Sequence, residues 1–164
     1  RSELVESRND ASSQFIICKL ADQDYGVRIT EIREIIRMQA VTALPDAPAY
    51  VSGILDFRGE VIAVVDLRRR LGLPSAPHTE ESRIVILDLD DHKVGITVDA
   101  VTEVTTVPHD SISAEDSAVI GARSEDVQSI AKLDDRLVIL LRVESLAGVG
   151  ASDDSGESQQ AVAA

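Results

Sequence analysis

Arg58 is the residue whose type and position best fit a binding role in this chain. It stands next to Gly59, between two apolar runs at residues 50–57 and 61–65 that are rich in large and β-branched side chains, as paired strands are. Glycine supplies the positive φ of a tight hairpin turn, so this turn holds Arg58 at a fixed place beside two buried strands. The alternative is that Arg58 is an ordinary solvated turn residue, and the spacing of the residues alone favours this alternative.

The sequence gives little support for a metal site or a bound cofactor. His78, His92 and His109 fall in three separate predicted loops, with no cysteine or carboxylate at the spacing of zinc or iron ligands. The acidic run at 88–91 lacks the glycine and the distal glutamate of an EF-hand loop. We therefore expect no metal and no cofactor, and interpret these residues as parts of surface loops and turns.

Catalytic motifs are equally scarce. Asp66 ends the apolar run VIAVVD and could be a phospho-acceptor, but that role belongs to doubly wound sheets with long helices, whereas short turns follow the strands here. We expect Asp66 to cap a helical turn at residues 67–70. Since the chain also lacks a phosphate-binding glycine loop, a nucleophile elbow and a local Cys/His pair, we predict that it is not an enzyme.

The charge of the chain argues against nucleic acid and anionic membranes as partners. The 164 residues carry a formal net charge of −13, with only two Phe, two Tyr and no Trp to stack on bases. Arg68, Arg69 and Arg70 make a nucleic-acid-binding barrel the runner-up, although three arginines beside carboxylates are more typical of a solvated or partner-facing turn. Residues 28–70 hold seven Arg against six acids, and 80–135 hold four bases against fourteen acids, so the first half better suits an acidic partner.

Cys18 and the apolar runs bear on the cellular setting. A single cysteine excludes an internal disulfide and fits a reducing compartment, with Cys18 as a small buried side chain. No apolar stretch approaches the length of about 18 residues that a membrane span requires, and no signal peptide is visible. We expect a soluble protein without membrane insertion.

Alternating apolar runs separated by polar turns predict four hairpins. Between the first two, Thr30 is expected to cap a helical turn with Ile29, Ile32 and Ile36 at helical spacing, and residues 42–48, with two prolines, to form a connection that cannot pair in a sheet. In the third hairpin Val94, Ile96 and Val98 should face inward, and Gly95 and Thr97 outward. The hairpins comprise residues 15–20 with 25–29, 50–57 with 61–65, 83–89 with 93–98, and 127–133 with 136–143.

About ten short strands fall into two similar groups on either side of the loop at 74–82. This predicts an all-β protein made of two small barrels, with a single sandwich as the alternative. We place the first barrel at about 15–73, the second at about 82–142 and a short C-terminal turn at 143–147. Residues 109–126 should be irregular, 1–14 a flexible arm and 148–164 a disordered tail.

Four segments, taken together and in order, resemble the CheW family of bacterial chemotaxis coupling proteins across residues 15–147. They are YGVRITEIREI, PDAPAYVSGILDFRGEVIAVVDLRRRLGL, SRIVILDLDDHKVGITVDAVTEV and LDDRLVILLRVESL. The resemblance implies two five-stranded SH3-like barrels around a shared core and no catalytic activity. It also implies an adaptor that connects the cytoplasmic tip of transmembrane chemoreceptors to the histidine kinase CheA, at the inner face of the membrane.

The resemblance also suggests site residues. Arg58 and Gly59 match the family's central turn, which the family associates with receptor coupling, and an apolar receptor helix is expected in a groove between the barrels. No residue is assigned to kinase binding. The groove walls match Ile32, Glu34 and Ile35 on one side and Gly95, Val101 and Val104 on the other.

The sequence departs from the family pattern at three positions. Asp56 replaces the usual Asn and could neutralise Arg58, while Ala63 replaces Pro and Ser129 replaces a common Gly, with local backbone effects. The regulatory domain of CheA and the N-terminal domain of CheV-type proteins share the fold, so a fragment of either is an alternative. The polar tails favour a free-standing protein.

Overall fold

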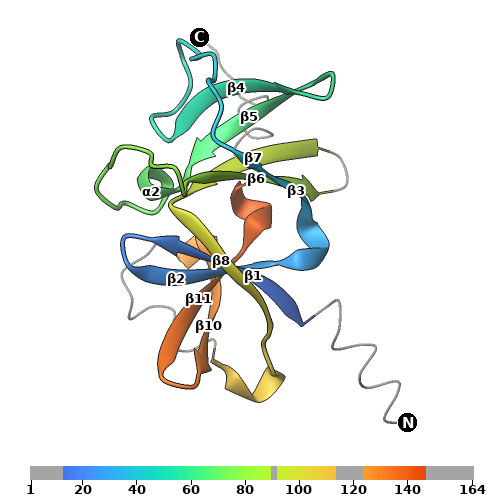
Figure 1. The fold of residues 1–164 in the computed structure, drawn as a ribbon, viewed down its shortest axis with the longest axis vertical. Coiled ribbons are helices and arrows are strands. Elements are labelled where there is room, and N and C mark those ends of the chain that lie inside the picture. The colour runs from blue at the N-terminus through green and yellow to red at the C-terminus, as the bar shows by residue number, and fades with distance from the viewer. Residues whose placement is uncertain (1–12, 90–91, 114–123, 147–164) are drawn as a thin grey trace.

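The computed structural model describes residues 13–89, 92–113 and 124–146, and these are mostly β-strand (Figure 1). Within these described ranges the helical elements are α2, three 3-10 turns and a helical turn at 143–146. The predicted tail lies outside the described residues, as does the arm up to residue 12. The elements are β1 (Gln14–Leu20), β2 (Gln23–Arg28), η1 (Ile29–Glu31), β3 (Ile32–Arg37), β4 (Val51–Phe57), β5 (Glu60–Asp66), α2 (Leu67–Arg70), β6 (Arg83–Leu89), β7 (His92–Val98), β8 (Ala100–Thr106), η2 (His109–Ser111), β9 (Ile112–Ser113), η4 (Ser124–Asp126), β10 (Val127–Leu133) and β11 (Arg136–Leu141).

The strands form two sheets that stack on each other, as Figure 1 shows. The five-stranded sheet has the order β3-β6-β7-β5-β4 and the six-stranded sheet the order β8-β1-β2-β11-β10-β9. All four predicted hairpins are present as neighbouring antiparallel strands. This architecture confirms the predicted all-β fold with two SH3-like barrels.

The two halves of the chain exchange their first hairpins. The β1–β2 hairpin pairs antiparallel with β8 and parallel with β11, both from the second half. The β6–β7 hairpin pairs in the same way with β3 and β5, from the first half. The predicted division into barrels at 15–73 and 82–142 is therefore wrong: the loop at 74–82 separates two structural repeats, and each barrel draws on both.

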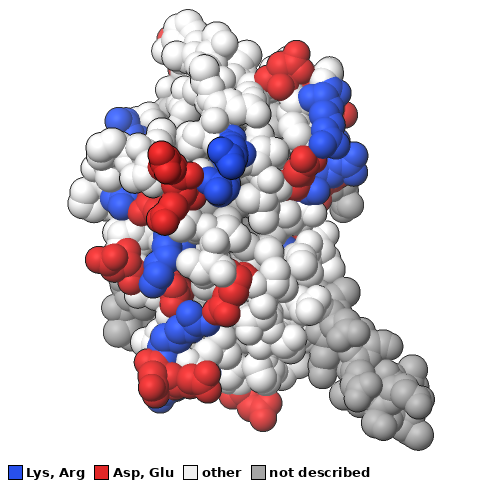
Figure 2. Space-filling model, in the orientation of Figure 1, with Lys and Arg blue, Asp and Glu red and all other residues white. Residues whose placement is uncertain are grey.

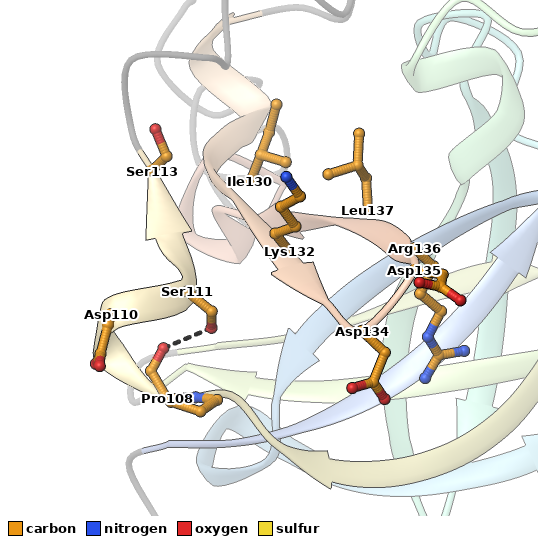
Figure 3. Close-up of a pocket in the computed structure, with 10 residues that line it drawn as sticks. All are labelled: Pro108, Asp110, Ser111, Ser113, Ile130, Lys132, Asp134, Asp135, Arg136 and Leu137. Carbon is orange, nitrogen blue, oxygen red and sulfur yellow. Dashed lines mark hydrogen bonds between the residues drawn. The ribbon is translucent and has the colours of Figure 1, made fainter.

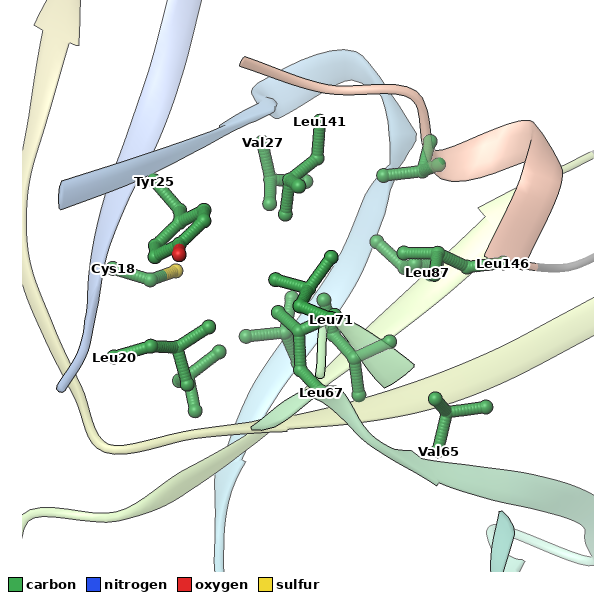
Figure 4. Close-up of a cluster of buried hydrophobic side chains, with 14 of the residues drawn as sticks. Cys18, Leu20, Tyr25, Val27, Val65, Leu67, Leu71, Leu87, Leu141 and Leu146 are labelled. Atoms are coloured by element: carbon green, nitrogen blue, oxygen red, sulfur yellow. The ribbon is translucent and has the colours of Figure 1, made fainter. Parts of the chain in front are cut away.

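Alternating side chains of the same strands fill three apolar clusters. In β1, Phe15 and Ile17 point into the barrel of the six-stranded sheet, whereas Ile16 and Cys18 face a larger cluster between the two sheets. A third cluster fills the other barrel. Figure 4 shows the shared cluster, which draws side chains from both sheets. Cys18 is fully buried there, as predicted, and burial raises the pKa of its thiol to about 12.

β7 is buried on both faces, so the prediction that Gly95 and Thr97 point outward is wrong. The strand lies between β6 and β5 in the middle of its sheet, with the shared cluster on one face and the barrel interior on the other. A Cβ at Gly95 would approach Ile84 Cγ2 to 2.9 Å. Glycine is needed at this position because the barrel interior is already filled.

Two local predictions before the central hairpin are also wrong. Only Ile29–Glu31 form a helical turn, a 3-10 turn whose N-cap is Arg28 and not Thr30, and the chain then continues as strand β3. Thr42, expected in an unpaired connection, forms a two-hydrogen-bond bridge with Ile54 on β4. Pairing with β6 overrides the helical spacing of the isoleucines, since a strand at this edge extends the barrel.

A buried ion pair joins the barrels. Arg70 in α2 is 4 % exposed and Asp126, directly before β10, is 0 % exposed. The Arg70 Nε and Nη2 donate to the two Asp126 carboxylate oxygens, each at 3.1 Å, and the guanidinium stacks on Tyr50 at 4.6 Å. The Ser145 hydroxyl donates to Asp126 Oδ1 at 2.7 Å, so the C-terminal helical turn joins the same network.

A second ion pair holds the point at which the chain passes from β7 to β8. Arg68 in α2 donates through Nε and Nη2 to the Asp99 carboxylate at 3.0 and 2.6 Å. The backbone N–H of Ala21, in the β1–β2 turn, donates to the same carboxylate at 3.0 Å. The hydrogen bonds from Arg68 lower the pKa of Asp99, with a smaller contribution from Ala21, and together they outweigh the opposing effect of burial.

Arg70→Ala should destabilise the fold strongly, because it leaves the Asp126 carboxylate buried without its cation. We expect a loss of about 3–5 kcal/mol in the free energy of unfolding, measured by urea denaturation. Arg69→Ala is the matched control: Arg69 is the next residue of the same short helix and is exposed, so its loss should cost under about 1 kcal/mol. Equal costs for the two variants would contradict the structural role of Arg70.

The Asp99 pair should contribute stability that depends on pH. The folded pKa lies below the unfolded value of about 3.9, so the contribution is complete above that value and is lost as the pH falls through the folded pKa. Asp99→Asn should therefore be less stable than the wild type at pH 7, with a difference that shrinks below about pH 4. A difference that stays constant from pH 7 to pH 2.5 in urea titrations would refute this linkage.

Candidate functional site

Arg58 occupies the tip of the β4–β5 hairpin in a conformation that its turn dictates. Both Arg58 (φ 53°) and Gly59 (φ 84°) have positive φ, as in the type I′ turns that suit two-residue hairpins. Asp56 Oδ1 accepts a hydrogen bond from the Gly59 N–H at 3.1 Å. Asp56 therefore stabilises the turn through its backbone.

The Arg58 guanidinium bonds across the barrel. Its Nη2 lies 2.9 and 3.0 Å from the two carboxylate oxygens of Glu34 on β3, and the group sits 5.1 Å from the Phe57 ring. The expectation that Asp56 could neutralise Arg58 is wrong, since Glu34 is its partner. β3 and β4 are opposite edges of the five-stranded sheet, so this ion pair brings the turn to the edge that carries Ile32 and Ile35.

A bulge at Arg33 turns Ile32 and Ile35 to the same face of β3. Without it, residues three apart on a strand would face opposite sides. Ile32 lies opposite Leu87 and Ile35 opposite Val85, and both isoleucines are half-buried against the shared cluster. They form an apolar stripe along an edge strand whose other side has no described strand partner.

β8 repeats this arrangement. A bulge at Thr102 brings Val101 and Val104 to one face of β8, opposite Cys18 and Ile16 of β1, which belong to the shared cluster. Val101 packs against that cluster and Val104 is 50 % exposed. The two predicted walls are therefore equivalent strands of the two repeats. Of the predicted residues, five lie on these two strands, Arg58 and Gly59 lie in the β4–β5 turn that bonds to β3, and Gly95 lies in the barrel interior.

The second repeat also contains an ion pair equivalent to Glu34–Arg58. Its residues were not predicted from the sequence. Glu103 on β8 corresponds to Glu34, and it bonds to Arg136 at the start of β11 as Glu34 bonds to Arg58. The signal was present: YGVRITEIREI at 25–35 aligns without gaps with VGITVDAVTEV at 94–104, which pairs Ile32 with Val101, Glu34 with Glu103 and Ile35 with Val104.

The arginine triplet at the end of β5 is structural. Arg68 and Arg70 are held by carboxylates, and only Arg69 is largely exposed, so the predicted solvated turn is wrong for two of the three. The face in Figure 2 shows basic and acidic side chains side by side and no continuous basic surface. The nucleic-acid alternative thus loses the cations on which it depended. Asp66 caps α2 as predicted, accepting from the Arg68 N–H at 3.1 Å.

A cavity of about 970 Å³ lies in the barrel of the six-stranded sheet, between η2, β9 and the β10–β11 hairpin (Figure 3). The Ser111 hydroxyl in its wall donates to the Pro108 carbonyl at 2.7 Å, so it is not directed at a general base. Arg136, at its rim, is engaged by Asp24 and Glu103. No group of three metal-ligating side chains occurs in the described part of the chain. None of the predicted site residues lines this cavity.

Comparisons with known proteins agree on one family. The family model described as CheW-like domain matches residues 14–149. The chain is 31% identical over 145 residues to the probable chemotaxis protein CheW of Rhizobium etli, covering 88% of this chain and 94% of that protein. It is 30% identical over 149 residues to the chemotaxis protein CheW of Bacillus subtilis, covering 91% and 92%.

A solved structure shows the same fold. The crystal structure of the scaffolding protein TtCheW from Thermoanaerobacter tengcongensis superposes with a TM-score of 0.74 at 31% sequence identity, over 80% of this chain and 85% of that one. The family model, the relatives and the exchanged two-barrel architecture lead to one conclusion: this chain belongs to the CheW family of chemotaxis scaffold proteins.

Proposed function

We propose that this protein is a non-enzymatic adaptor that couples transmembrane chemoreceptors to the histidine kinase CheA. The observation that carries the proposal is the placement of Arg58: its turn and the Glu34 ion pair hold it at the edge strand β3, whose other face carries the apolar stripe of Ile32 and Ile35. A charged group with a fixed position on the same edge strand as a half-buried apolar stripe suits recognition of an amphipathic helix. Membership of a chemotaxis scaffold family supports the same role.

The receptor tip would contact the edge strands β3 and β8. Side chains of a receptor helix would pack on the half-buried Ile32, Ile35 and Val101 and on the exposed Val104, and Arg58 would bind a carboxylate or carbonyl group at the rim. Because the strands are packed on a rigid shared core, little ordering entropy would be lost on binding.

The adaptor role places the protein in the cytoplasm, at the inner face of the membrane where receptor tips are found. In the part of the chain that the structure describes, no helix is long and apolar enough to span a bilayer. The kinase would bind a different face, so that one molecule can hold receptor and kinase together. The Ser111 hydroxyl donates to the Pro108 carbonyl, and Asp66 accepts from the backbone at the start of α2. These contacts support an adaptor without catalysis.

Arg58→Ala should weaken receptor binding without weakening the fold. The side chain is 65% exposed, so its loss opens no cavity, and we expect a thermal midpoint close to that of the wild type. Loss of a docked guanidinium should cost roughly 1–3 kcal/mol, or about ten- to a hundredfold in Kd. The measurement is the Kd for a chemoreceptor cytoplasmic fragment by isothermal titration calorimetry.

Ile35→Ala and Arg69→Ala are the comparison variants. Ile35→Ala should also weaken binding, and it counts only if the variant melts like the wild type, because Ile35 packs on the shared cluster. Arg69→Ala removes an exposed arginine away from β3 and should leave the Kd unchanged. Wild-type affinity in Arg58→Ala would show that the coupling site is not at this turn.

A further inference from the structure

Two arginines lie directly opposite each other where β3 ends and β6 begins. Arg37, the last residue of β3, lies directly opposite Arg83, the first residue of β6. Like charges at directly opposed positions of an antiparallel pair are destabilising. Among the described residues no carboxylate forms an ion pair with either guanidinium. Both guanidinium groups are therefore without a direct carboxylate partner in the described part of the chain.

The two arginines line an open cavity of about 580 Å³ and differ in freedom. Arg83 Nη1 donates to the carbonyls of Glu80 and Ser82, each at 2.8 Å, which fixes the guanidinium and leaves its other N–H groups available. The Arg37 side chain is exposed, and its guanidinium forms no hydrogen bond within the described chain. One cation is thus held in place and the other can close on a ligand. Glu80 and Glu81 also line this cavity, but neither forms an ion pair with Arg37 or Arg83.

This cation pair lies on the face of β3 that carries the apolar stripe. Ile35 and Arg37 are two residues apart, so both point to the same side of the strand. The equivalent end of β8 differs, because there Thr106 lies opposite Gln14. The apolar positions of the site are repeated on β3 and β8, whereas the charge at the strand ends is not.

We propose that Arg37 and Arg83 bind a carboxylate of the partner helix and thereby fix the direction in which the helix lies on β3 and β8. The proposal rests on the proposed receptor-binding role of these strands. A pair of equivalent apolar stripes would accept a helix in either direction with similar contacts. A charge-assisted hydrogen bond at only one end supplies the difference between the two directions.

Arg37→Gln tests the proposal against Arg33→Gln as its matched control. Both residues are exposed arginines of β3, but Arg33 lies in the bulge and has no opposed cation. With the chemoreceptor cytoplasmic fragment, Arg37→Gln should raise the Kd about tenfold at 50 mM salt and much less at 500 mM, whereas Arg33→Gln should stay within about twofold. The thermal midpoint of Arg37→Gln should not fall, because the substitution removes a repulsion.

Two outcomes separate this inference from the proposed function. Wild-type affinity in Arg37→Gln, with a fragment that the wild type binds, overturns the inference and leaves the receptor site standing. A fragment that fails to bind the wild type overturns both. Photo-crosslinking from a benzophenone attached to the thiol of Gln39→Cys or Thr106→Cys reads the direction. Acidic receptor peptides should attach at position 39 alone, and at both positions when Arg37→Gln is added. The same crosslinking pattern with and without Arg37→Gln also overturns the inference.

Discussion

The buried contact between Arg70 and Asp126 is the constraint on which the arrangement of the two barrels depends. Burying either charge alone would be strongly unfavourable, so α2 and the segment before β10 must stay together for both to remain neutralised. Stacking on Tyr50 and the hydrogen bond from Ser145 fix the geometry further. The apolar cluster between the sheets stabilises their contact by burial, and the ion pair specifies which surfaces meet.

The exchange of hairpins explains why the proposed binding strands lie at sheet edges. β3 leaves the β1–β2 hairpin to join the other barrel, and β8 leaves the β6–β7 hairpin in the opposite direction. Each crossing strand is paired on one side and carries a bulge that turns two apolar residues to the same face. The ion pairs Glu34–Arg58 and Glu103–Arg136 then tie each edge to a hairpin of its own barrel. The proposed receptor surface follows from the connection between the repeats.

Local features of the fold could be predicted and distant pairings could not. Alternation and turn residues located the four hairpins, and Asp66 was recognisable as a cap because capping is a contact between near neighbours. The hairpin exchange depends on contacts between residues far apart in sequence, which periodicity does not encode. Arg70 looked like a solvated residue because its partner lies 56 positions away, and Gly95 looked like a groove residue although its missing side chain serves the barrel interior. The resemblance to the family nevertheless selected seven residues that lie on β3 and β8 or in the β4–β5 turn that bonds to β3.

The most direct test of the proposed receptor surface is methyl NMR of the full chain during titration with a chemoreceptor cytoplasmic fragment. Ile32, Ile35, Val101 and Val104 report on the two edge strands, while Leu44 and Leu137 are exposed apolar residues elsewhere, at 41% and 52%, and serve as internal controls. The account predicts that the methyl signals of the first four residues shift or broaden on binding and that those of Leu44 and Leu137 do not. Shifts confined to Leu44 or Leu137, with Ile32 and Ile35 unchanged, would contradict it.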